Sequence, residues 1–295
     1  MANKKLKVTV VQHSCTDDVN ANRQQIRSAI IQAANQHAKL VVLPELHDTL
    51  YFCQSEKESA FDLAQSIPGP STEELSELAS DYEIVIVASL FEKRATGLYH
   101  NSVVVFDSDG SIAGIYRKMH IPDDPGYYEK YYFAPGDLGF QPIETSVGKL
   151  GVMICWDQWF PEAARLMALA GAEILIYPTA IGWEPENSTQ KKVIELDAWK
   201  TVQRAHAIAN GLPLIVANRC GLEEDFSTEN NRIDFWGHSF VTGCQGEVLA
   251  EVKTQPAIFS TEINLAQSED VRRAWPFLRD RRIDAYYDLL RLNID

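Results

Sequence analysis

The sequence predicts an α/β protein in which β-sheets are sandwiched between layers of helices. The first observation is a set of short apolar runs at residues 40–43, 84–90 and 150–154, which suit strands buried on both faces. The second is that segments with apolar residues at helical spacing alternate with the predicted strands: residues 19–37 lie between strands 6–11 and 40–43, and residues 193–210 between strands 173–177 and 212–217. Alternation of buried strands with amphipathic helices is typical of sheets covered by helices.

The first half of the chain alternates strands with helices. In order, its predicted elements are a strand at 6–11, a helix at 19–37, a strand at 40–43, a helix at 72–82, and strands at 84–90, 98–106 and 111–116. The helix at 72–82 is predicted because Ser71 and Glu74 have the Ser-x-x-Glu spacing of a capping box. The last two strands are joined by residues 108–110, Ser-Asp-Gly, which indicate a hairpin and hence some antiparallel pairing.

A long segment at 117–141, rich in Pro, Gly, Asp and Tyr, separates the two halves, and its length and many aromatic residues indicate a functional loop rather than a disordered one. In order, the predicted elements of the second half are a strand at 150–154, a helix from Pro161, a strand at 173–177, a helix at 193–210, and strands at 212–217, 235–242, 247–252 and 258–263. No linker divides the chain, so residues 1–265 are predicted to form one domain and residues 266–295 a C-terminal helix and arm. The charged segment at 279–282 is interpreted as a solvated cluster or as part of an arm that reaches a partner subunit.

Composition excludes several classes of function. The formal net charge of −14 argues against nucleic acid or an anionic membrane surface as the main partner, and it suits a small cationic substrate. No apolar run approaches the roughly 18 residues of a membrane helix, and the N-terminus lacks the apolar segment of a secretory signal, so we expect a cytoplasmic protein. The five cysteines and seven histidines are scattered without the spacing of disulfide or metal sites, so neither a disulfide framework nor a metal centre is predicted.

Three reactive side chains follow directly after predicted strands: Glu45, Lys118 and Cys155. Ligands collect at the carboxyl ends of strands, so the three are expected to meet in one crevice. Together they supply what acyl transfer needs, namely a carboxylate base, an ammonium that stabilises an oxyanion, and a thiol nucleophile. Backbone N–H groups just after Cys155 would point into the same turn, where they can favour a thiolate and later hold the oxyanion.

Each of these residues also has a plainer interpretation. Free cysteine is among the most buried residue types, so an isolated Cys155 suits a core position. Glu45 has the place of a first-turn helix residue, and Lys118 that of a surface lysine beside Arg117. The shared placement at three strand ends favours a catalytic site over three separate structural roles.

The segments around these residues are Leu43-Pro-Glu45, Tyr116-Arg-Lys-Met-His-Ile-Pro122 and Cys155-Trp-Asp-Gln-Trp-Phe-Pro-Glu162. In content and order they resemble the three catalytic motifs of the nitrilase superfamily of carbon-nitrogen hydrolases, and the similarity extends over residues 8–263. The resemblance implies a four-layer α-β-β-α sandwich, a Glu45–Lys118–Cys155 triad, no metal, no organic cofactor, and a homo-oligomer that is at least a dimer. It also implies that Glu129 supports the triad, for which a surface salt bridge is the alternative.

Within the superfamily, residues 120–127, 129–137, 155–165 and 177–185 are most similar to N-carbamoylputrescine amidohydrolases. This implies hydrolysis of N-carbamoylputrescine to putrescine, carbon dioxide and ammonia through a cysteine-linked intermediate. Enzymes of N-carbamoyl amino acids need cations to hold a carboxylate, and in related ones arginines closely follow the nucleophile, where this chain has Gln158 and Trp159.

An acidic, aromatic pocket would instead suit the ammonium of a small carbamoylated amine. The candidate substrate-binding residues are Glu184 as the first choice of anchor, Asp123, Asp124 and Tyr51 behind it, and Trp156, whose N–H would help Lys118 to hold the oxyanion. Because the chain is strongly acidic, a carboxylate near any chosen site is also expected without a role in binding.

Three alternatives remain. The first is another amidase of the same superfamily, such as a ureidopropionase or an omega-amidase, whose substrate carries a carboxylate. The second is a non-catalytic binding protein that retains the fold. A papain-like protease fits less well, because no cysteine lies in a Cys-Gly-x-Cys-Trp signature.

Overall fold

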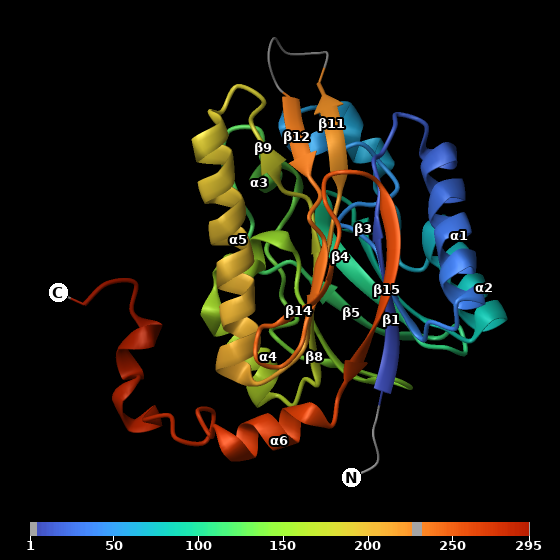
Figure 1. Cartoon of the computed structure of the whole chain (residues 1–295). Coiled ribbons are helices and arrows are strands. Elements are labelled where there is room, and N and C mark those ends of the chain that lie inside the picture. The colour runs from blue at the N-terminus through green and yellow to red at the C-terminus, as the bar shows by residue number, and fades with distance from the viewer. Residues whose placement is uncertain (1–4, 226–231, 295) are drawn as a thin grey trace.

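The computed structural model describes residues 5–225 and 232–294 (Figure 1). The helices are α1 (Val19–Asn35), α2 (Pro70–Tyr82), α3 (Glu129–Tyr132), α4 (Pro161–Leu169), α5 (Thr189–Asn210) and α6 (Gln267–Ala274). The strands are β1 (Lys5–Gln12), β2 (Leu40–Val42), β3 (Val85–Ala95), β4 (Leu98–Phe106), β5 (Ile112–Arg117), β6 (Ile143–Thr145), β7 (Gly148–Val152), β8 (Ile174–Thr179), β9 (Gly182–Trp183), β10 (Leu214–Asn218), β11 (Cys220–Glu224), β12 (Arg232–Trp236), β13 (Phe240–Thr242), β14 (Val248–Glu251) and β15 (Ala257–Asn264). Residues 1–4 and 295, which the predicted domain and arm include, lie outside the described residues.

Two six-stranded sheets form the centre of the molecule, in the orders β15-β1-β2-β3-β4-β5 and β14-β13-β10-β8-β7-β6. The neighbouring strands β1, β2 and β3 are parallel in the first sheet, as are β7, β8 and β10 in the second. Strand β5 is two antiparallel steps from β3, through the predicted β4–β5 hairpin, and therefore runs in the same direction as β3. The residues that follow β2 and β5 consequently lie at the same end of the strands of the first sheet.

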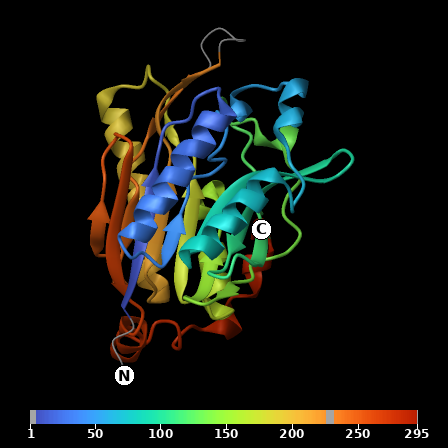
Figure 2. The ribbon, with the colours of Figure 1, turned by 90° about the vertical axis from the view of Figure 1, so that its right-hand side faces the viewer.

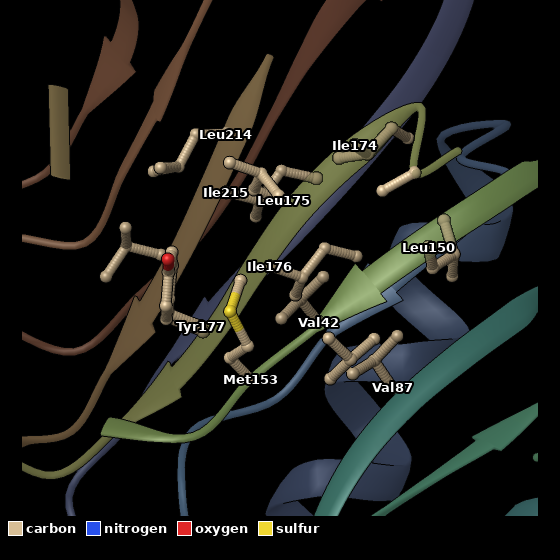
Figure 3. Packing of buried hydrophobic residues seen from close by; sticks show 14 of the residues in the cluster. Val42, Val87, Leu150, Met153, Ile174, Leu175, Ile176, Tyr177, Leu214 and Ile215 are labelled. Carbon is tan, nitrogen blue, oxygen red and sulfur yellow. The ribbon is translucent and has the colours of Figure 1, made fainter. Parts of the chain in front are cut away.

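The two sheets pack face to face, and helices cover their outer faces (Figures 1 and 2). Successive strand residues point to opposite faces, so Val85 and Val87 contribute to the core between the sheets whereas Ile86 packs with residues of α1 and α2. Figure 3 shows Val42 and Val87 of the first sheet in the same core as Met153, which directly follows β7 of the second. Helices α4 and α5 pack against the second sheet. The predicted four-layer sandwich is confirmed.

Helix α2 exists as predicted, but the predicted capping box is wrong. The helix begins at Pro70, which suits a first helical position because no N–H is needed there. The N-cap is Gly69, whose N–H donates to Thr72 Oγ1 at 2.7 Å. The Ser71 hydroxyl instead donates to Asp48 Oδ2, at 3.0 Å, so a tertiary partner takes the side chain that the local pattern assigned to the cap.

The predicted strand at 235–242 is two strands, β12 and β13. They are separated because Gly237 and His238 adopt left-handed backbone conformations, with φ of 65° and 54°. A Cβ at position 237 would lie 2.7 Å from the backbone carbonyl oxygen of Lys253, so only glycine permits this close approach. The break lets β12 join a small sheet in the order β11-β12-β9, whereas β13 stays in the second large sheet. Strands β6, β9 and β11 were not predicted, and helix α5 begins at Thr189 rather than 193, with Ser188 as its N-cap.

The long connection between β5 and β6 is ordered by its aromatic residues. Phe133 lies 5.2 Å from Phe91 and 6.1 Å from Phe52, measured between ring centroids, and Tyr132 joins the same cluster. The one-turn helix α3 forms within this connection. The expectation of an ordered loop is therefore confirmed, and its aromatic cluster fixes the position of the residues that it carries.

The C-terminal arm, residues 275–294, follows α6 and leaves the body of the molecule (Figure 1). Its large apolar side chains are mostly exposed, including Tyr287 (76%) and Leu290 (94%). Arg279 and Arg282 pair with acidic residues inside the arm itself. In the part of the chain that the structure describes, no helix combines the length and the apolar character needed to cross a membrane.

Candidate active site

Glu45 lies in the turn that follows β2. The turn is sharp, because Leu46 adopts a left-handed conformation with φ of 49°. The Glu45 side chain is fully buried, and its Oε1 accepts hydrogen bonds from Lys118 Nζ and from Asn101 Nδ2, both at 2.7 Å. Its other oxygen, Oε2, has no hydrogen-bond partner among the described residues. One oxygen of this carboxylate is therefore fixed and the other is free to take a proton.

Lys118 continues the direction of β5, and its N–H donates to Asn101 O at 2.9 Å. Its ammonium is fully buried and donates to Glu129 Oε2 as well as to Glu45 Oε1, each at 2.7 Å. Burial lowers the pKa of Lys118, but the two carboxylates more than offset this and hold the pKa well above its usual range. Lys118 thus remains a cation, as stabilising an oxyanion requires.

Glu129 is supplied by α3, and Tyr51 OH donates to its Oε1 at 2.7 Å. Burial raises the pKa of Glu129 to about 7, with Lys118 opposing the rise and Glu45 adding to it. Glu129 is fully buried, so the alternative of a surface salt bridge is wrong. The cluster places two carboxylates around one ammonium, so Glu45 adds to the main effect of burial in raising the pKa of Glu129.

Cys155 begins the short 3₁₀ turn Cys155–Trp159 that separates β7 from α4. Its φ of 42° is uncommon for a residue other than glycine, so the sulfur is presented by a strained turn. Burial raises the pKa of the Cys155 thiol well above its usual range, and Glu45 raises it further while Lys118 lowers it. The expectation of a favoured thiolate therefore does not hold at rest, because a buried thiol beside a carboxylate keeps its proton until a base removes it.

Asp157 holds this turn together and was missed by sequence reasoning. Its buried carboxylate accepts hydrogen bonds from Ile154 N–H at 3.0 Å, from Tyr116 OH at 2.7 Å and from His120 Nδ1 at 2.7 Å. The last two partners flank Lys118 in sequence, so Asp157 joins the cysteine turn to the lysine segment. The signal was present, since an acidic residue three positions after the last extended residue is typical of a capped turn.

A cavity of about 530 Å³ opens on Cys155. Its wall includes aromatic residues, namely Tyr127, Trp156, Trp159 and Trp236, and charged residues, namely Asp124, Glu184, Glu186, Glu195 and Arg232. Surface hollows of about 660 and 760 Å³ elsewhere contain none of the four candidate catalytic residues. The cavity is therefore the place where a substrate can reach the thiol.

The predicted substrate-binding residues divide into two groups. Trp156, Glu184 and Asp124 line the cavity. Tyr51 and Asp123 are not among its described lining residues: Tyr51 is buried behind Glu129, and Asp123 is exposed to solvent. Sequence reasoning also missed Arg232, because the side chain reaches the cavity from the small sheet, far along the chain from the motifs.

No group of three or more His, Cys, Asp or Glu side chains is arranged to hold a metal ion within residues 5–225 and 232–294. The cavity reaches the Cys155 thiol, and the thiol interacts with the buried Glu45 carboxylate, which has one free oxygen, and with the buried Lys118 ammonium. These groups suit attack on a carbonyl carbon followed by loss of an amine.

Comparison with known proteins agrees with this geometry. The sequence pattern of the carbon-nitrogen hydrolase family matches residues 7–273. An N-carbamoylputrescine amidase of Solanum lycopersicum is 44% identical, over 99% of this chain and 98% of its own. A citrullinase of Francisella tularensis is 44% identical over 99% of both chains. The crystal structure of a carbon-nitrogen hydrolase from Helicobacter pylori G27 is 55% identical, covers 98% of this chain and 100% of its own, and gives a TM-score of 0.96.

These similarities extend over nearly the whole length of each protein, including the segments that carry Glu45, Lys118 and Cys155. The resemblance seen in the three motifs is confirmed, as is the assignment to an enzyme family. The chain belongs to the carbon-nitrogen hydrolase family.

Proposed function

We propose that this chain hydrolyses N-carbamoylputrescine to putrescine, carbon dioxide and ammonia, a step of polyamine biosynthesis. The observation that carries the proposal is the cavity above Cys155, whose wall combines tryptophans with four carboxylates. Such a wall attracts a substrate ammonium through charge pairing and cation–π contact. The Solanum lycopersicum relative, which is 44% identical and is named an N-carbamoylputrescine amidase, supports the same substrate.

In the first half of the reaction, Glu45 Oε2 takes the Cys155 proton as the sulfur attacks the carbamoyl carbon. Lys118 Nζ and the Trp156 N–H hold the oxyanion. The bond from carbon to the terminal nitrogen then breaks, and Glu45 returns the proton to the departing ammonia. The product of this half is a carbamoyl thioester on Cys155, with Glu129 still fixing the Lys118 ammonium.

In the second half, Glu45 takes a proton from water, and the resulting hydroxide attacks the thioester carbon. The carbon–sulfur bond breaks, and the proton held by Glu45 passes to the sulfur and restores the thiol. The released carbamate loses carbon dioxide and gives putrescine. The cycle therefore needs only water as co-reactant and returns every catalytic group to its starting state.

Glu184 is proposed to bind the substrate ammonium, with Asp124 as the second carboxylate within the cavity. Tyr51 is better placed to hold Glu129, to which it donates its hydroxyl proton. Asp123 lies outside the lining of the cavity and is not kept as an anchor.

The test is a panel of substrates assayed by ammonia release: N-carbamoylputrescine, N-carbamoyl-β-alanine and an ω-amide of a dicarboxylate. We expect kcat/KM for N-carbamoylputrescine to exceed that of the carboxylate substrates by about a hundredfold or more, because they would bring an unpaired carboxylate into an acidic cavity. Cys155→Ala should abolish turnover, whereas Cys244→Ala, at a buried free cysteine outside the cavity, should retain it.

Preference for a carboxylate substrate would instead assign a ureidopropionase or omega-amidase activity. Failure of Cys155 to react with any acylating substrate in the panel would favour the non-catalytic binding protein. Glu184→Gln should raise KM for the amine about tenfold, equivalent to ~1.4 kcal/mol of lost binding.

Citrulline is a second candidate, since Arg232 in the cavity wall provides a cation for a substrate carboxylate, and the Francisella relative is named a citrullinase. Arg232 already donates from Nε to Glu186 at 3.0 Å and lies 4.0 Å from Glu224, so its charge is largely compensated. We therefore rank the amine first. Measurable citrulline turnover that is lost in Arg232→Gln would reverse this order.

Two further proposals concern the setting of the enzyme. The exposed apolar side chains of the C-terminal arm suit contact with a partner subunit, so we propose a homo-oligomer that is at least a dimer, with residues 266–295 outside the main domain. All five cysteines are free and buried, which suits the proposed cytoplasmic location because reducing compartments keep thiols unpaired.

A further inference from the structure

A second buried ion pair lies outside the catalytic cluster and is not used by the mechanism. Arg219 stands between β10 and β11, and Glu223 belongs to β11. Both side chains are almost entirely buried, and Arg219 Nη1 donates to Glu223 Oε2 at 3.1 Å. The desolvation penalty of burying such a pair can exceed the attraction between its charges, so a buried ion pair is weak evidence for a stabilising role and its position calls for another explanation.

Arg219 is hydrogen-bonded to the backbone of the turn that contains Glu45. Its Nη2 donates to the carbonyl oxygen of Leu46 at 2.9 Å and to that of Thr49 at 2.5 Å. The guanidinium carbon also lies 5.3 Å from the ring centroid of Phe235, which fixes the plane of the fork. Because Leu46 directly follows Glu45 and has a left-handed backbone, the position of its carbonyl determines how the Glu45 side chain leaves the turn.

Glu223 is hydrogen-bonded to the backbone just after the same turn, at Tyr51. Its Oε2 accepts the backbone N–H of Tyr51 at 2.6 Å. The hydroxyl of Tyr51 in turn donates to Glu129 Oε1, and Glu129 binds the Lys118 ammonium. A continuous series of short contacts thus leads from the ion pair to both carboxylates of the catalytic cluster.

We propose that Arg219 and Glu223 are positioning residues for the catalytic carboxylates: Arg219 orients Glu45 through the turn 45–49, and Glu223 orients Glu129 through Tyr51. The fork of Arg219 can bind two carbonyls and one carboxylate at once, which the single ammonium of a lysine cannot reproduce in the same geometry. The inference rests on the catalytic roles proposed above for Glu45 and Glu129.

The test uses Arg219→Lys, Glu223→Gln and Tyr51→Phe, with Glu251→Gln as the control. The control breaks the partly buried pair of Lys200 and Glu251, neither of which lines the cavity. We expect Glu223→Gln to lower kcat about tenfold and Arg219→Lys up to about a hundredfold, with KM within about twofold, because small misplacements of catalytic groups reduce kcat. The control should keep kcat within about twofold.

The pH profile separates charge from geometry. Glu223→Gln leaves the Arg219 cation uncompensated, which lowers the pKa of nearby carboxylates, so the acidic limb of kcat/KM should move to lower pH. Arg219→Lys keeps the charge and should leave that limb in place while kcat falls. If both variants fold and show wild-type kcat per labelled active site with unchanged profiles, the pair is only structural and the proposal is overturned.

The double variant Glu223→Gln/Tyr51→Phe tests the path through Tyr51. If Glu223 acts through that hydroxyl, the double variant should lose no more kcat than the more affected single variant, within about twofold. Losses that multiply would overturn this path. Because Glu223→Gln conserves shape, it keeps the test informative even if Arg219→Lys fails to fold.

Alkylation of Cys155 by iodoacetamide, measured in the same variants, keeps this test separate from the choice of substrate. If the folded wild-type protein does not hydrolyse N-carbamoylputrescine, the proposed function is overturned. Slower alkylation of Cys155 in Glu223→Gln than in the control would still support the positioning role. Equal alkylation rates in those two variants would overturn positioning whatever the substrate.

Discussion

At the scale of single residues, the proposed catalytic cluster of Glu45, Lys118, Glu129 and Cys155 has more carboxylates than cations. The single positive charge of Lys118 is shared by the carboxylates of Glu45 and Glu129, so it cannot neutralise both. The pKa of Glu129 rises from its ordinary 4.5 to about 7, with burial as the largest cause. Glu45 Oε2 has no hydrogen-bond partner among the described residues, and the Cys155 thiol beside it is protonated. Glu45 Oε2 can therefore accept the thiol proton without first breaking another of these hydrogen bonds. This arrangement makes two predictions about Glu129.

Glu129→Gln should change how stability depends on pH. Between pH 4.5 and 7 the folded wild type holds a proton on Glu129 that the unfolded chain has released, so this residue's contribution to stability decreases as pH rises through that window. Glutamine has no such proton. The free energy of unfolding of the variant minus that of the wild type should therefore increase from pH 5 to pH 7, as measured by urea denaturation.

Taking this difference cancels the titrating groups that do not interact with Glu129, including the buried His206, whose pKa is lowered to about 4 by burial. A difference that stays constant with pH would mean that the pKa of Glu129 is not raised. The same variant should lose about tenfold or more in kcat, because the Lys118 ammonium loses one of its two carboxyl partners.

At the scale of elements, the long connection after β5 positions Lys118 by backbone contacts. Gly136 N–H donates to Lys118 O at 2.8 Å, and a Cβ at position 136 would lie 2.1 Å from Arg117 O. The loop therefore returns directly onto the lysine segment, and only glycine permits so close an approach. The aromatic cluster around Phe133 holds the loop in this position.

Gly136→Ala should consequently shift the Lys118 segment, lowering both the thermal midpoint and kcat, with about 1–3 kcal/mol of lost stability. The matched control is Gly139→Ala in the same connection, where φ is 70° but no atom lies within 4 Å of the added Cβ. The control should lose about 1–2 kcal/mol through backbone strain alone and keep its kcat. Equal kcat in the two variants would contradict the positioning role of this contact.

At the scale of the whole molecule, the two sheets bring together side chains that come from both halves of the chain. Glu45 and Lys118 follow strands of the first sheet and Cys155 follows a strand of the second, so the cluster forms only where the sheets meet. The C-terminal arm is the one described segment in which large apolar side chains such as Leu290 and Leu292 stay almost fully exposed. Burial of these side chains by another subunit would remove them from water.

The arm predicts a specific change in assembly. Replacing Leu289, Leu290 and Leu292 by serine should lower the molecular mass measured by sedimentation or light scattering, because the proposed apolar contact with a partner subunit would be lost. Arg279→Gln should leave the mass unchanged, since Arg279 pairs with Asp280 inside the arm. If the serine variant keeps the wild-type mass, the arm is not the contact between subunits.

Sequence alone determined the class of fold and indicated the candidate catalytic residues. Buried strands and amphipathic helices could be predicted because periodicity is a local property of the sequence. Glu45, Lys118 and Cys155 could be singled out because each follows a predicted strand directly. Tertiary structure decided the rest. Ser71 is drawn away from the cap of α2 by Asp48, and Asp157 is bonded to Tyr116 and His120. These partners are distant in the chain, as are the backbone groups that Arg219 and Glu223 bind in their proposed role. Hydrogen bonds and pKa shifts arise from such contacts in space, which no local pattern records.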